Sequence, residues 1–473
     1  MLLHKNSKVI LLLILATFFL KGVFLSSSYP IFGGQDESRH YNTIQYFAEP
    51  KEKSWELQES LAKRDENQIE TYRYSDEIRK TIIATDTNII RGELFNTINF
   101  SNDYVENNEA AINSLQWKPY NYNLQPEIIA GSLFHAIASL IEKVFNNQNI
   151  LVRFYLTRIF CVFLGTLAIL FFYLTTKTIG ISSKNSLLLT AIISFQPKFS
   201  AYLSNVNYDA LLIPLFFLFT LAGVMLLKNG LNWKNLLLLL ASTILAITTK
   251  ITGLVLLVIF ASIVTFLLYT KVKTKSKNIR YLIYFTCVLL FILLAMYLGT
   301  FLPTKEQSIS QIFNSVQGYL KESKGFGLSA RTYWGTPDDS LQIIKYIEIL
   351  ALIGIGLLFF SKKESAIWQT NFLPEKKYVF FLLFMVVTLQ LEIRVADWTF
   401  FNRLGRIETG MPGRYFLPNL GAHIMLMFIG LGAIFAYFKR EQYLEKALIV
   451  GMLAMFSFSF YTLFNGLILR YYL

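Results

Sequence analysis

Runs of about 20 apolar residues recur along the chain and constrain its fold more than any other feature, because a helix needs that length to cross a bilayer. Six runs contain no Asp, Glu, Lys or Arg: 159–176, 210–227, 251–270, 281–304, 415–438 and 447–469. Five more are shorter or interrupted by charge: 9–26, 185–203, 235–249, 342–361 and 378–395. The sequence therefore predicts an all-α integral membrane protein with about eleven transmembrane helices.

The composition supports this class. Of the 473 residues, 54% are hydrophobic and only 16% are charged, against roughly 25% charged residues in an ordinary soluble domain. Such a chain is too apolar for a disordered segment or a soluble globule. Its two cysteines, Cys161 and Cys287, lie in apolar runs, so we expect small core residues and no disulfide.

The net charge of +13 follows the expected topology. With the N-terminus in the cytoplasm, eleven crossings place five basic loops on the cytoplasmic side: 177–184, 228–234, 271–280, 362–377 and 439–446. The short outer turns hold far fewer cations, which is the positive-inside pattern expected of a multi-pass protein of the plasma (inner) membrane. The lipid bilayer thus explains the charge, and nucleic acid is not an expected partner.

The same count divides the chain into a first transmembrane helix (1–26), a large extracytoplasmic loop (27–150), a bundle (151–302), a second extracytoplasmic loop (303–341) and a second bundle (342–473). The first helix is expected to be a retained anchor rather than a signal peptide, because no small-residue cleavage site precedes Tyr29. Apolar residues at helical spacing over 126–145 predict an amphipathic helix. We expect it to lie in the membrane interface, since a twelfth span would move the Lys-rich loops outside.

Two carboxylates and a histidine follow the first span, in the string Gly33-Gly34-Gln35-Asp36-Glu37-Ser38-Arg39-His40. In a helix that starts near Gln35, Asp36 and His40 share one face. A carboxylate beside an apolar surface can serve as a general base, which makes Asp36, Glu37 and His40 the candidate catalytic residues. The alternative is an ordinary helix N-terminus, where acidic residues complement the helix dipole.

Arginines gather near the outer end of the tenth span. Arg414 adjoins that span, Arg403 and Arg406 precede it on the same loop, and Arg394 ends the ninth span. A guanidinium at headgroup depth can bind a lipid phosphate through two parallel hydrogen bonds. The candidate ligands of a donor phosphate are therefore Arg414, Arg403, Arg406 and Lys250. The alternative for each is a snorkelling interfacial cation.

Other polar and aromatic strings supply candidate substrate contacts. Asp209 opens the fourth span opposite Lys198 of the third, so these two could instead pair with each other. Aromatic faces near a turn are typical of sugar sites, although ordinary loop cores use them too. The candidate substrate-binding residues are Asn207, Asp209, Tyr333, Trp334 and Tyr415.

The order of these strings resembles a family of bacterial polytopic membrane proteins of unassigned function. That family is related to the GT-C glycosyltransferases, the superfamily of the protein O-mannosyltransferases and the lipid A aminoarabinose transferase. The resemblance covers nearly the whole chain by order of elements and rests on short strings: Asp36-Glu37-x-x-His40, Asn207-x-Asp209-Ala210-Leu211, Trp334-Gly335 and Gly413-Arg414-Tyr415-Phe416-Leu417-Pro418. The sequence departs from the family where Gln35 replaces a proline, and where Gln125-Pro126-Glu127 replaces a Pro-Pro pair.

The resemblance implies a GT-C-like fold, a polyprenyl-phosphate-linked sugar as donor, and inversion at the anomeric carbon. The acceptor would be an envelope glycan, lipid or protein on the extracytoplasmic face. Asp36 corresponds to the catalytic Asp of the first outer loop, and Arg414 and Lys250 would stabilise the leaving phosphate. No cofactor is required on this interpretation. A divalent cation stays an alternative, with three candidate ligands: Glu37, Asp338 and Asp339.

Other functions stay open at this point. An envelope glycan polymerase or ligase also uses a polyprenyl-linked sugar, but from a diphosphate-linked donor. A secondary transporter predicts broken helices, charges at mid-bilayer and inverted repeats, whereas the charges here crowd the outer ends and no repeat is present. A structural membrane component would tolerate the replacement of Asp36.

Overall fold

The structure is a computed structural model that describes residues 2–48, 74–85, 129, 132–272, 309–322, 342–361, 372–406 and 413–469. Within these ranges the regular structure is entirely helical, which confirms the predicted fold class. The helices are α1 (Leu2–Ser28), α2 (Glu37–Ala48), α4 (Asp76–Ala84), α7 (Leu133–Val144), α8 (Ile150–Thr178), α9 (Ser183–Phe195), α10 (Pro197–Leu203), α11 (Asp209–Asn229), α12 (Trp233–Thr249), η2 (Ile251–Gly253), α13 (Leu254–Val272), α15 (Ile309–Glu322), α17 (Gln342–Phe360), α18 (Lys376–Leu404), η5 (Gly413–Asn419), α19 (Leu420–Tyr437), α20 (Gln442–Leu463) and η6 (Phe464–Ile468).

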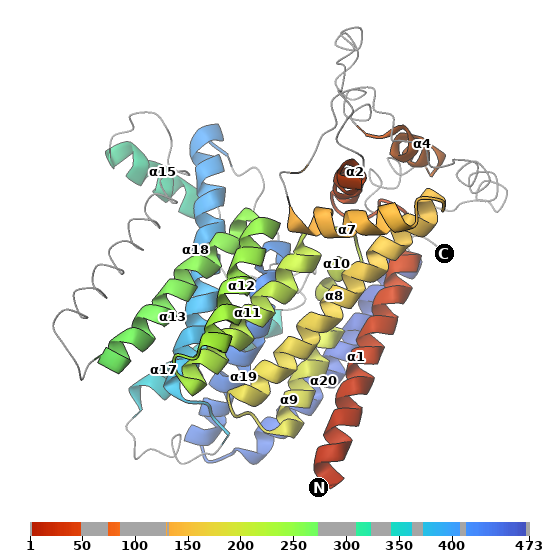
Figure 1. Cartoon of the computed structure of the whole chain (residues 1–473). Helices are drawn as coiled ribbons and strands as arrows, with labels where there is room; N and C mark the ends of the chain where they lie inside the picture. The colour runs from red at the N-terminus through yellow and green to blue at the C-terminus, as the bar shows by residue number, and fades with distance from the viewer. Residues whose placement is uncertain are drawn as a thin grey trace.

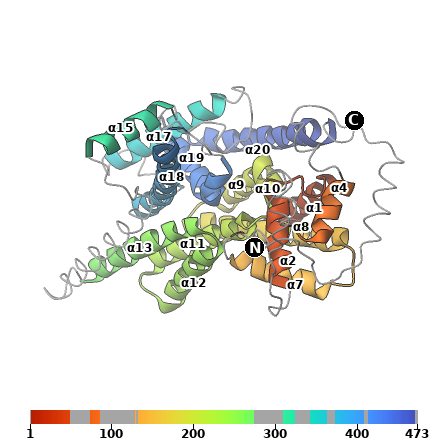
Figure 2. The ribbon, with the colours of Figure 1, turned by 90° about the horizontal axis from the view of Figure 1, so that it is seen from above.

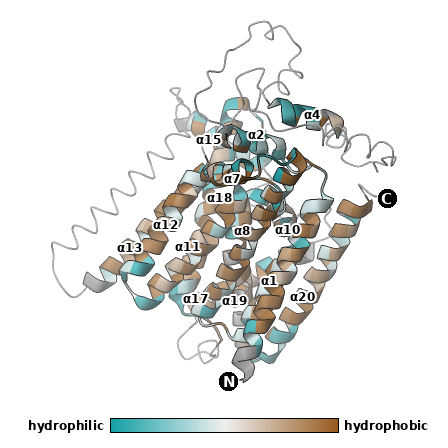
Figure 3. Cartoon of the chain, turned by 45° about the vertical axis from the view of Figure 1, so that its right-hand side comes forward, coloured by the Kyte–Doolittle hydropathy of each residue, from teal (hydrophilic) through white to brown (hydrophobic). Residues whose placement is uncertain are grey.

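The long helices run side by side as one bundle, and the shorter helices α2, α4 and α7 lie over one end of it (Figure 1). The N-terminus lies at the opposite end. Seen from above, α1, α2, α4, α7 and α8 gather on one side of the bundle, away from α17 and α18 (Figure 2). Hydrophobic residues cover the long helices, while hydrophilic residues concentrate at helix ends and on α4 (Figure 3). This distribution is that of a protein with a lipid-facing belt.

Seven helices within the described residues are long and apolar enough to cross a membrane: Asn6–Ser28, Ile150–Thr178, Asp209–Asn229, Ile251–Thr270, Lys376–Leu404, Gly413–Tyr437 and Gln442–Ile468. The predicted count of eleven is not confirmed. Run 185–203 is divided into α9 and α10 by Pro197, which lacks the N–H that an uninterrupted helix needs. Run 235–249 lies in α12, which has only 17 residues, and 281–304 lies outside the described residues.

The amphipathic helix expected over 126–145 is observed as α7. It has 12 residues, too few to cross a bilayer, and it lies across the end of the bundle, over α8 and beside α2 (Figure 1). Its buried face carries Phe134, His135, Ala138 and Glu142. Helix α7 therefore forms, with α2, a layer that covers one end of the bundle.

Buried charges attach this layer to the bundle. Arg153 of α8 forms ion pairs with Glu142 of α7 and with Glu77 of α4. The Tyr41 hydroxyl of α2 donates to the same Glu142 carboxylate. Arg153 and Glu142 are fully buried, so these bonds are shielded from solvent and strongly orientation-dependent. Helices α2, α4, α7 and α8 are thereby held in one arrangement.

Small residues let two bundle helices approach closely. Gly354 of α17 lies against Gly430 of α19, and a Cβ on Gly354 would meet the Gly430 carbonyl oxygen at 1.9 Å. Glycine is required there because any side chain would push the two backbones apart. The contact fixes α17 against α19, the helix that carries the chain away from η5.

Candidate active site

The turn between α1 and α2 requires a residue without a side chain at Gly34 and a left-handed backbone at Asp36. Gly34 packs against its surroundings so closely that a Cβ would lie 2.9 Å from the Glu37 Oε2 atom and 3.0 Å from the Asn205 Cβ atom. Asp36 has φ of 56°, in the left-handed region that Asp and Asn tolerate better than most residues. The turn thus places Asp36 and Glu37 next to each other but in different surroundings.

Glu37 is fully buried and holds the turn in place. Its carboxylate accepts from Arg158 Nε at 2.8 Å and from Arg158 Nη2 at 2.7 Å. It also accepts from the backbone N–H groups of Gly34 (2.9 Å) and Val206 (2.8 Å). The Arg158 guanidinium in turn donates to the carbonyl oxygens of Ser26, Tyr29 and Pro30. These bonds occupy the Glu37 carboxylate and hold the turn, while its predicted role as catalytic residue or metal ligand stays a prediction.

Asp36 and Arg414 lie together although 378 residues separate them in sequence. The distance between Arg414 Nη2 and Asp36 Oδ2 is 3.8 Å. The Asp36 side chain is 46% exposed and that of Arg414 13% exposed, so the carboxylate is open to a ligand while the guanidinium is held. The Arg414 guanidinium lies 4.9 Å from the ring centroid of Tyr415. The structure thus brings these two charges, from opposite ends of the chain, to one place.

A second cation adjoins this pair. Lys250 Nζ lies 2.9 Å and 3.1 Å from the two carboxylate oxygens of Asp209, and the Tyr202 hydroxyl donates to Asp209 at 2.8 Å. The same ammonium lies 4.4 Å from the ring centroid of Tyr208 and 4.9 Å from that of Tyr415. Tyr415 therefore contacts both Arg414 and Lys250, and it joins the two charge pairs into one continuous site.

One expectation at the start of α11 needs correction, and a second residue there has a local structural role. Asp209 pairs with Lys250, and not with Lys198 as the sequence alternative had it. Asn207 is buried; its Nδ2 atom donates to two loop carbonyls at 2.9 Å each and its Oδ1 atom accepts from the Ala210 N–H at 3.1 Å. Asn207 therefore shapes the loop that begins α11, and the structure gives no contact between it and the exposed Asp36 carboxylate.

His40 lies behind the site, in a buried pair with His135 of α7. The His40 Nδ1 and His135 Nε2 atoms are 3.0 Å apart, and the rings are stacked at 5.3 Å. The His40 ring also meets the Tyr208 ring edge-on at 4.6 Å. Burial lowers the pKa of His135 to about 3. Burial, with the nearby charges of His135, Lys250 and Arg414, lowers the pKa of His40 well below its usual value. Both rings are thus neutral near pH 7.

This pair predicts a loss of stability in acid. Both pKa values are lower in the folded chain than in the unfolded chain, so the stability that the neutral pair contributes is fully present above about pH 6.5. As the pH falls from there toward 3, the unfolded chain takes up the protons first, and stability falls by at most about 1.4 kcal/mol per pH unit for each histidine. Thermal unfolding of the purified protein from pH 7.5 to pH 5 measures this slope. A variant with Gln at both positions should have a shallower slope, and an equal slope would contradict the assignment.

The rim arginines do not converge as the sequence indicated. Arg394 lies within α18 and interacts with Tyr319 of α15. Arg403 and Arg406 lie exposed at the end of α18, and no ion pair or hydrogen bond in the described part of the chain joins either of them to Asp36 or Arg414. Of the four arginines, the structure brings only Arg414 to the acidic turn.

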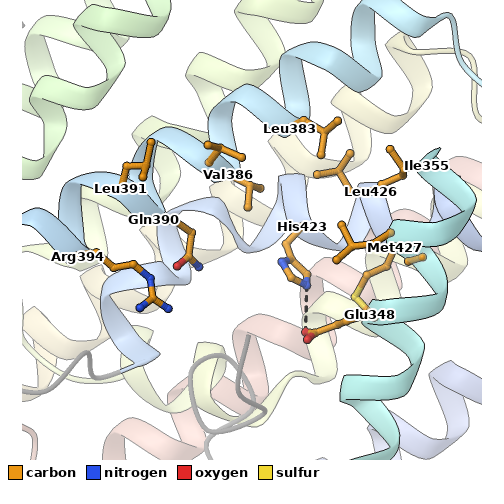
Figure 4. Close-up of a pocket in the computed structure, with 13 residues that line it drawn as sticks. Glu348, Ile355, Leu383, Val386, Gln390, Leu391, Arg394, His423, Leu426 and Met427 are labelled. Atoms are coloured by element: carbon orange, nitrogen blue, oxygen red, sulfur yellow. Dashed lines mark hydrogen bonds and ion pairs between the residues drawn. The ribbon is translucent and has the colours of Figure 1, made fainter. Parts of the chain in front are cut away.

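A second polar cluster, which sequence reasoning missed, lies between α17, α18 and α19. His423 Nε2 and Glu348 Oε1 are 3.2 Å apart, beside Gln390 and Arg394, in a cavity of about 260 Å³ with otherwise apolar walls (Figure 4). Side chains about half exposed lie at its edge: Leu352, Val387 and Leu391. The signal that could have found it is a carboxylate, Glu348, within an apolar run, because charges in spans are costly and face the bundle interior.

Several predicted site residues lie outside the described residues: Tyr333, Trp334, Asp338 and Asp339. Their expected roles in sugar and metal binding therefore stay predictions. Within the ranges that the structure describes, no group of three or more His, Cys, Asp or Glu side chains is placed to hold a metal ion.

Residues 128–307 match the sequence model of the family PMT, described as dolichyl-phosphate-mannose-protein mannosyltransferase. The match begins just before α7 and includes α8 to α13, so it covers Arg158, Asp209 and Lys250 but neither Asp36 nor Arg414. No curated protein matches the chain.

Proposed function

We propose that this chain, whose residues 128–307 match the PMT family model, is a multi-pass membrane glycosyltransferase that moves mannose from a polyprenyl phosphate to an envelope acceptor with Asp36 as general base. The observation that carries the proposal is the ion pair of the exposed Asp36 carboxylate and the Arg414 guanidinium. A base for a hydroxyl and a cation for a phosphate then lie side by side, as sugar transfer from a lipid phosphate requires.

The proposed reaction forms one bond and breaks one. The acceptor hydroxyl oxygen attacks the anomeric carbon, while the bond from that carbon to the phosphate oxygen breaks on the opposite face, which inverts the configuration. Asp36 accepts the hydroxyl proton. The phosphate, a diester with one negative charge, leaves as the polyprenyl monoester with a second negative charge. The proposal assigns no step to a metal ion.

Arg414 is the cation that we assign to the developing negative charge. A guanidinium can donate two parallel hydrogen bonds to a phosphate. The contacts of Arg414 with the Asp36 carboxylate (3.8 Å) and the Tyr415 hydroxyl (3.4 Å) are long, so a phosphate can replace them. Lys250 is already paired with Asp209 at 2.9 Å, so its charge is largely compensated. We therefore assign Lys250 to holding Tyr415 and Tyr208 at the site, with a smaller share in phosphate binding.

The basic loops support an extracytoplasmic site. The N-terminus and the loop between α8 and α9 lie at the end of the bundle opposite α2 and α7 (Figure 1). Lys177 in the last turn of α8 and Lys184 in the first turn of α9 flank that loop, and positive charge at this position favours the cytoplasmic side. By this rule the Asp36 turn faces the extracytoplasmic side of the plasma membrane.

Arg414→Ala should lower kcat/KM for the donor by about 10²–10³-fold, because it removes the group that stabilises the leaving phosphate. Arg414→Lys should recover part of the loss, since it restores the charge without the paired donors. The measurement is release of polyprenyl phosphate from radiolabelled polyprenyl-phosphate mannose by the purified protein. Arg440→Ala, an exposed arginine at the other end of the bundle, is the matched control.

Measuring KM for the acceptor in the same assay shows whether Arg414→Ala affects phosphate binding specifically or damages the protein in general. A phosphate ligand affects the donor far more than the acceptor, so KM for the acceptor should stay close to that of the wild-type protein. Equal effects of Arg414→Ala on donor and acceptor would contradict the assignment. Unchanged envelope glycans in cells with and without the chain would count against the proposed function as a whole.

A further inference from the structure

A polar cavity of about 240 Å³ lies between α1, α10 and the end of α20. Two ammonium groups line it, Lys21 of α1 and Lys198 of α10, together with the hydroxyl side chains of Ser200, Ser459 and Thr462. None of the residues that line the cavity is acidic. It is thus a concave site lined by positive charge and hydroxyl groups, and the mechanism proposed above uses neither lysine.

Lys21 is bonded only to neutral groups. Its Nζ atom donates to the Ser194 carbonyl oxygen at 2.6 Å and lies 3.5 Å from the Ser459 hydroxyl. The aromatic ring of Phe195 lies 5.6 Å away. The Ser194 carbonyl lies next to the helix break before Pro197, where the regular helical bonding ends. An ammonium has three N–H donors, so Lys21 keeps donor capacity toward the cavity.

Lys198 makes no hydrogen bond and no ion pair with any residue that the structure describes. Burial lowers the pKa of the Lys198 ammonium, and repulsion by the positive charge of the Arg414 guanidinium, in the candidate site, lowers it further. Two ammonium groups and a guanidinium thus gather beside a membrane, and charges in such surroundings are costly unless an opposite charge compensates them. An anion in the cavity would supply that charge.

One side of the cavity faces the lipid-exposed helices α1 and α20, and the other side faces the turn that holds Asp36. Helices α1 and α20 are the least enclosed of the seven candidate spans, with 22% and 11% of their apolar windows buried inside the protein. A membrane lipid can therefore approach between them. On the other side, Tyr29 lines the cavity, and its carbonyl oxygen accepts from Arg158 at 2.7 Å. The same Arg158 binds Glu37, next to Asp36.

We propose that this cavity binds the phosphate group of a membrane lipid beside the Asp36–Arg414 pair, with Lys21 and Lys198 as its ligands. The inference deepens the proposed function, on which it rests for the role of that lipid as a substrate. Two lipids fit the chemistry: the polyprenyl-phosphate donor, or a second, phosphate-bearing lipid that acts as acceptor. A second lipid is the stronger fit, because Arg414 already provides a phosphate ligand for the donor.

Native mass spectrometry of the full-length protein in detergent tests the site. The probes are dioleoyl phosphatidic acid and undecaprenyl phosphate, with dioleoyl phosphatidylcholine as the lipid without net charge. Lys198→Gln and Lys21→Gln should each weaken phosphatidic acid binding about tenfold or more, because each removes a charge-assisted contact. Lys198→Gln breaks no observed bond, so it is expected to fold normally. Lys234→Gln, an exposed lysine on α12, is the matched control.

The outcomes separate the possible occupants and the two proposals. Simultaneous binding of both phosphate lipids identifies a second lipid, whereas mutual displacement, with loss of both in Lys198→Gln, identifies the donor phosphate. The inference is overturned if both lysine variants bind phosphatidic acid with unchanged affinity, or if Lys234→Gln loses as much affinity as they do. It is also overturned if inorganic phosphate displaces phosphatidic acid as effectively as undecaprenyl phosphate does. Asp36→Asn should still bind phosphatidic acid although it no longer transfers sugar. The binding measurement therefore tests the lipid site independently of the transferase proposal.

Discussion

Asp36→Asn should reduce sugar transfer by about 10²–10⁴-fold, the range that a positioned general base contributes. Asparagine is nearly isosteric and tolerates the left-handed backbone of this residue, whose φ is 56°, so the turn should keep its shape. The variant removes only the ability to accept a proton from the acceptor hydroxyl. Transfer of radiolabelled mannose from its polyprenyl phosphate by the purified protein measures the loss.

Two controls make this result specific. Asp76→Asn changes a partly exposed carboxylate on α4 that pairs with Arg79 three residues along the same helix, and it should leave transfer at the wild-type level. Donor binding by Asp36→Asn should persist, since Arg414 remains in place. Near-normal transfer by Asp36→Asn in a folded, membrane-inserted protein would remove Asp36 from the mechanism.

The second large effect concerns stability. Arg158→Leu should destabilise the fold by about 3–5 kcal/mol, because it leaves the fully buried Glu37 carboxylate without its partner. Glu37→Gln should cost less, since the amide oxygen can still accept from the Gly34 and Val206 N–H groups. Thermal and denaturant unfolding of the purified variants measure both changes. Mild destabilisation of Arg158→Leu, similar to that of a surface substitution, would contradict the ion-pair assignment.

A double variant tests whether the two side chains act as a pair. Glu37→Gln combined with Arg158→Leu removes both charges, so its destabilisation should be smaller than the sum of the single effects. The pair also fixes the turn before Asp36. The kcat of the double variant should therefore fall by more than the decrease in the amount of folded protein accounts for. Additive energies would show that Glu37 and Arg158 act independently.

Much of the fold could be predicted from the sequence because a membrane span needs a long apolar run, and such runs are visible without a structure. Helices α8, α11, α13, α19 and α20 lie where those runs predict them. The prediction failed in detail where one residue changes the backbone, as Pro197 does between α9 and α10. The length of an apolar run does not show whether a helix bends, breaks or stops short.

The site was predicted in its outline for a different reason. Asp36 and Arg414 are charges next to apolar runs, where the cost of burial makes each one conspicuous. Their partners could not be assigned, because partner choice depends on how the helices pack. Arg158 stands immediately before the run 159–176, and nothing in that position marks it as the buried partner of Glu37. His135 lies in the amphipathic helix predicted over 126–145, and that pattern does not mark it as the partner of His40.

The two buried arginines of α8 have a consequence for how the protein is made. Arg153 and Arg158 lie near the start of a membrane helix, where an unpaired guanidinium would face lipid at high cost. Within the described part of the chain they form ion pairs with Glu37, Glu77 and Glu142, and these three carboxylates come earlier in the sequence. During synthesis the chain emerges from its N-terminus, so the acidic partners are already available when α8 enters the membrane. The order of charges along the polypeptide thus ties the stable insertion of α8 to the prior translocation of the segment before it.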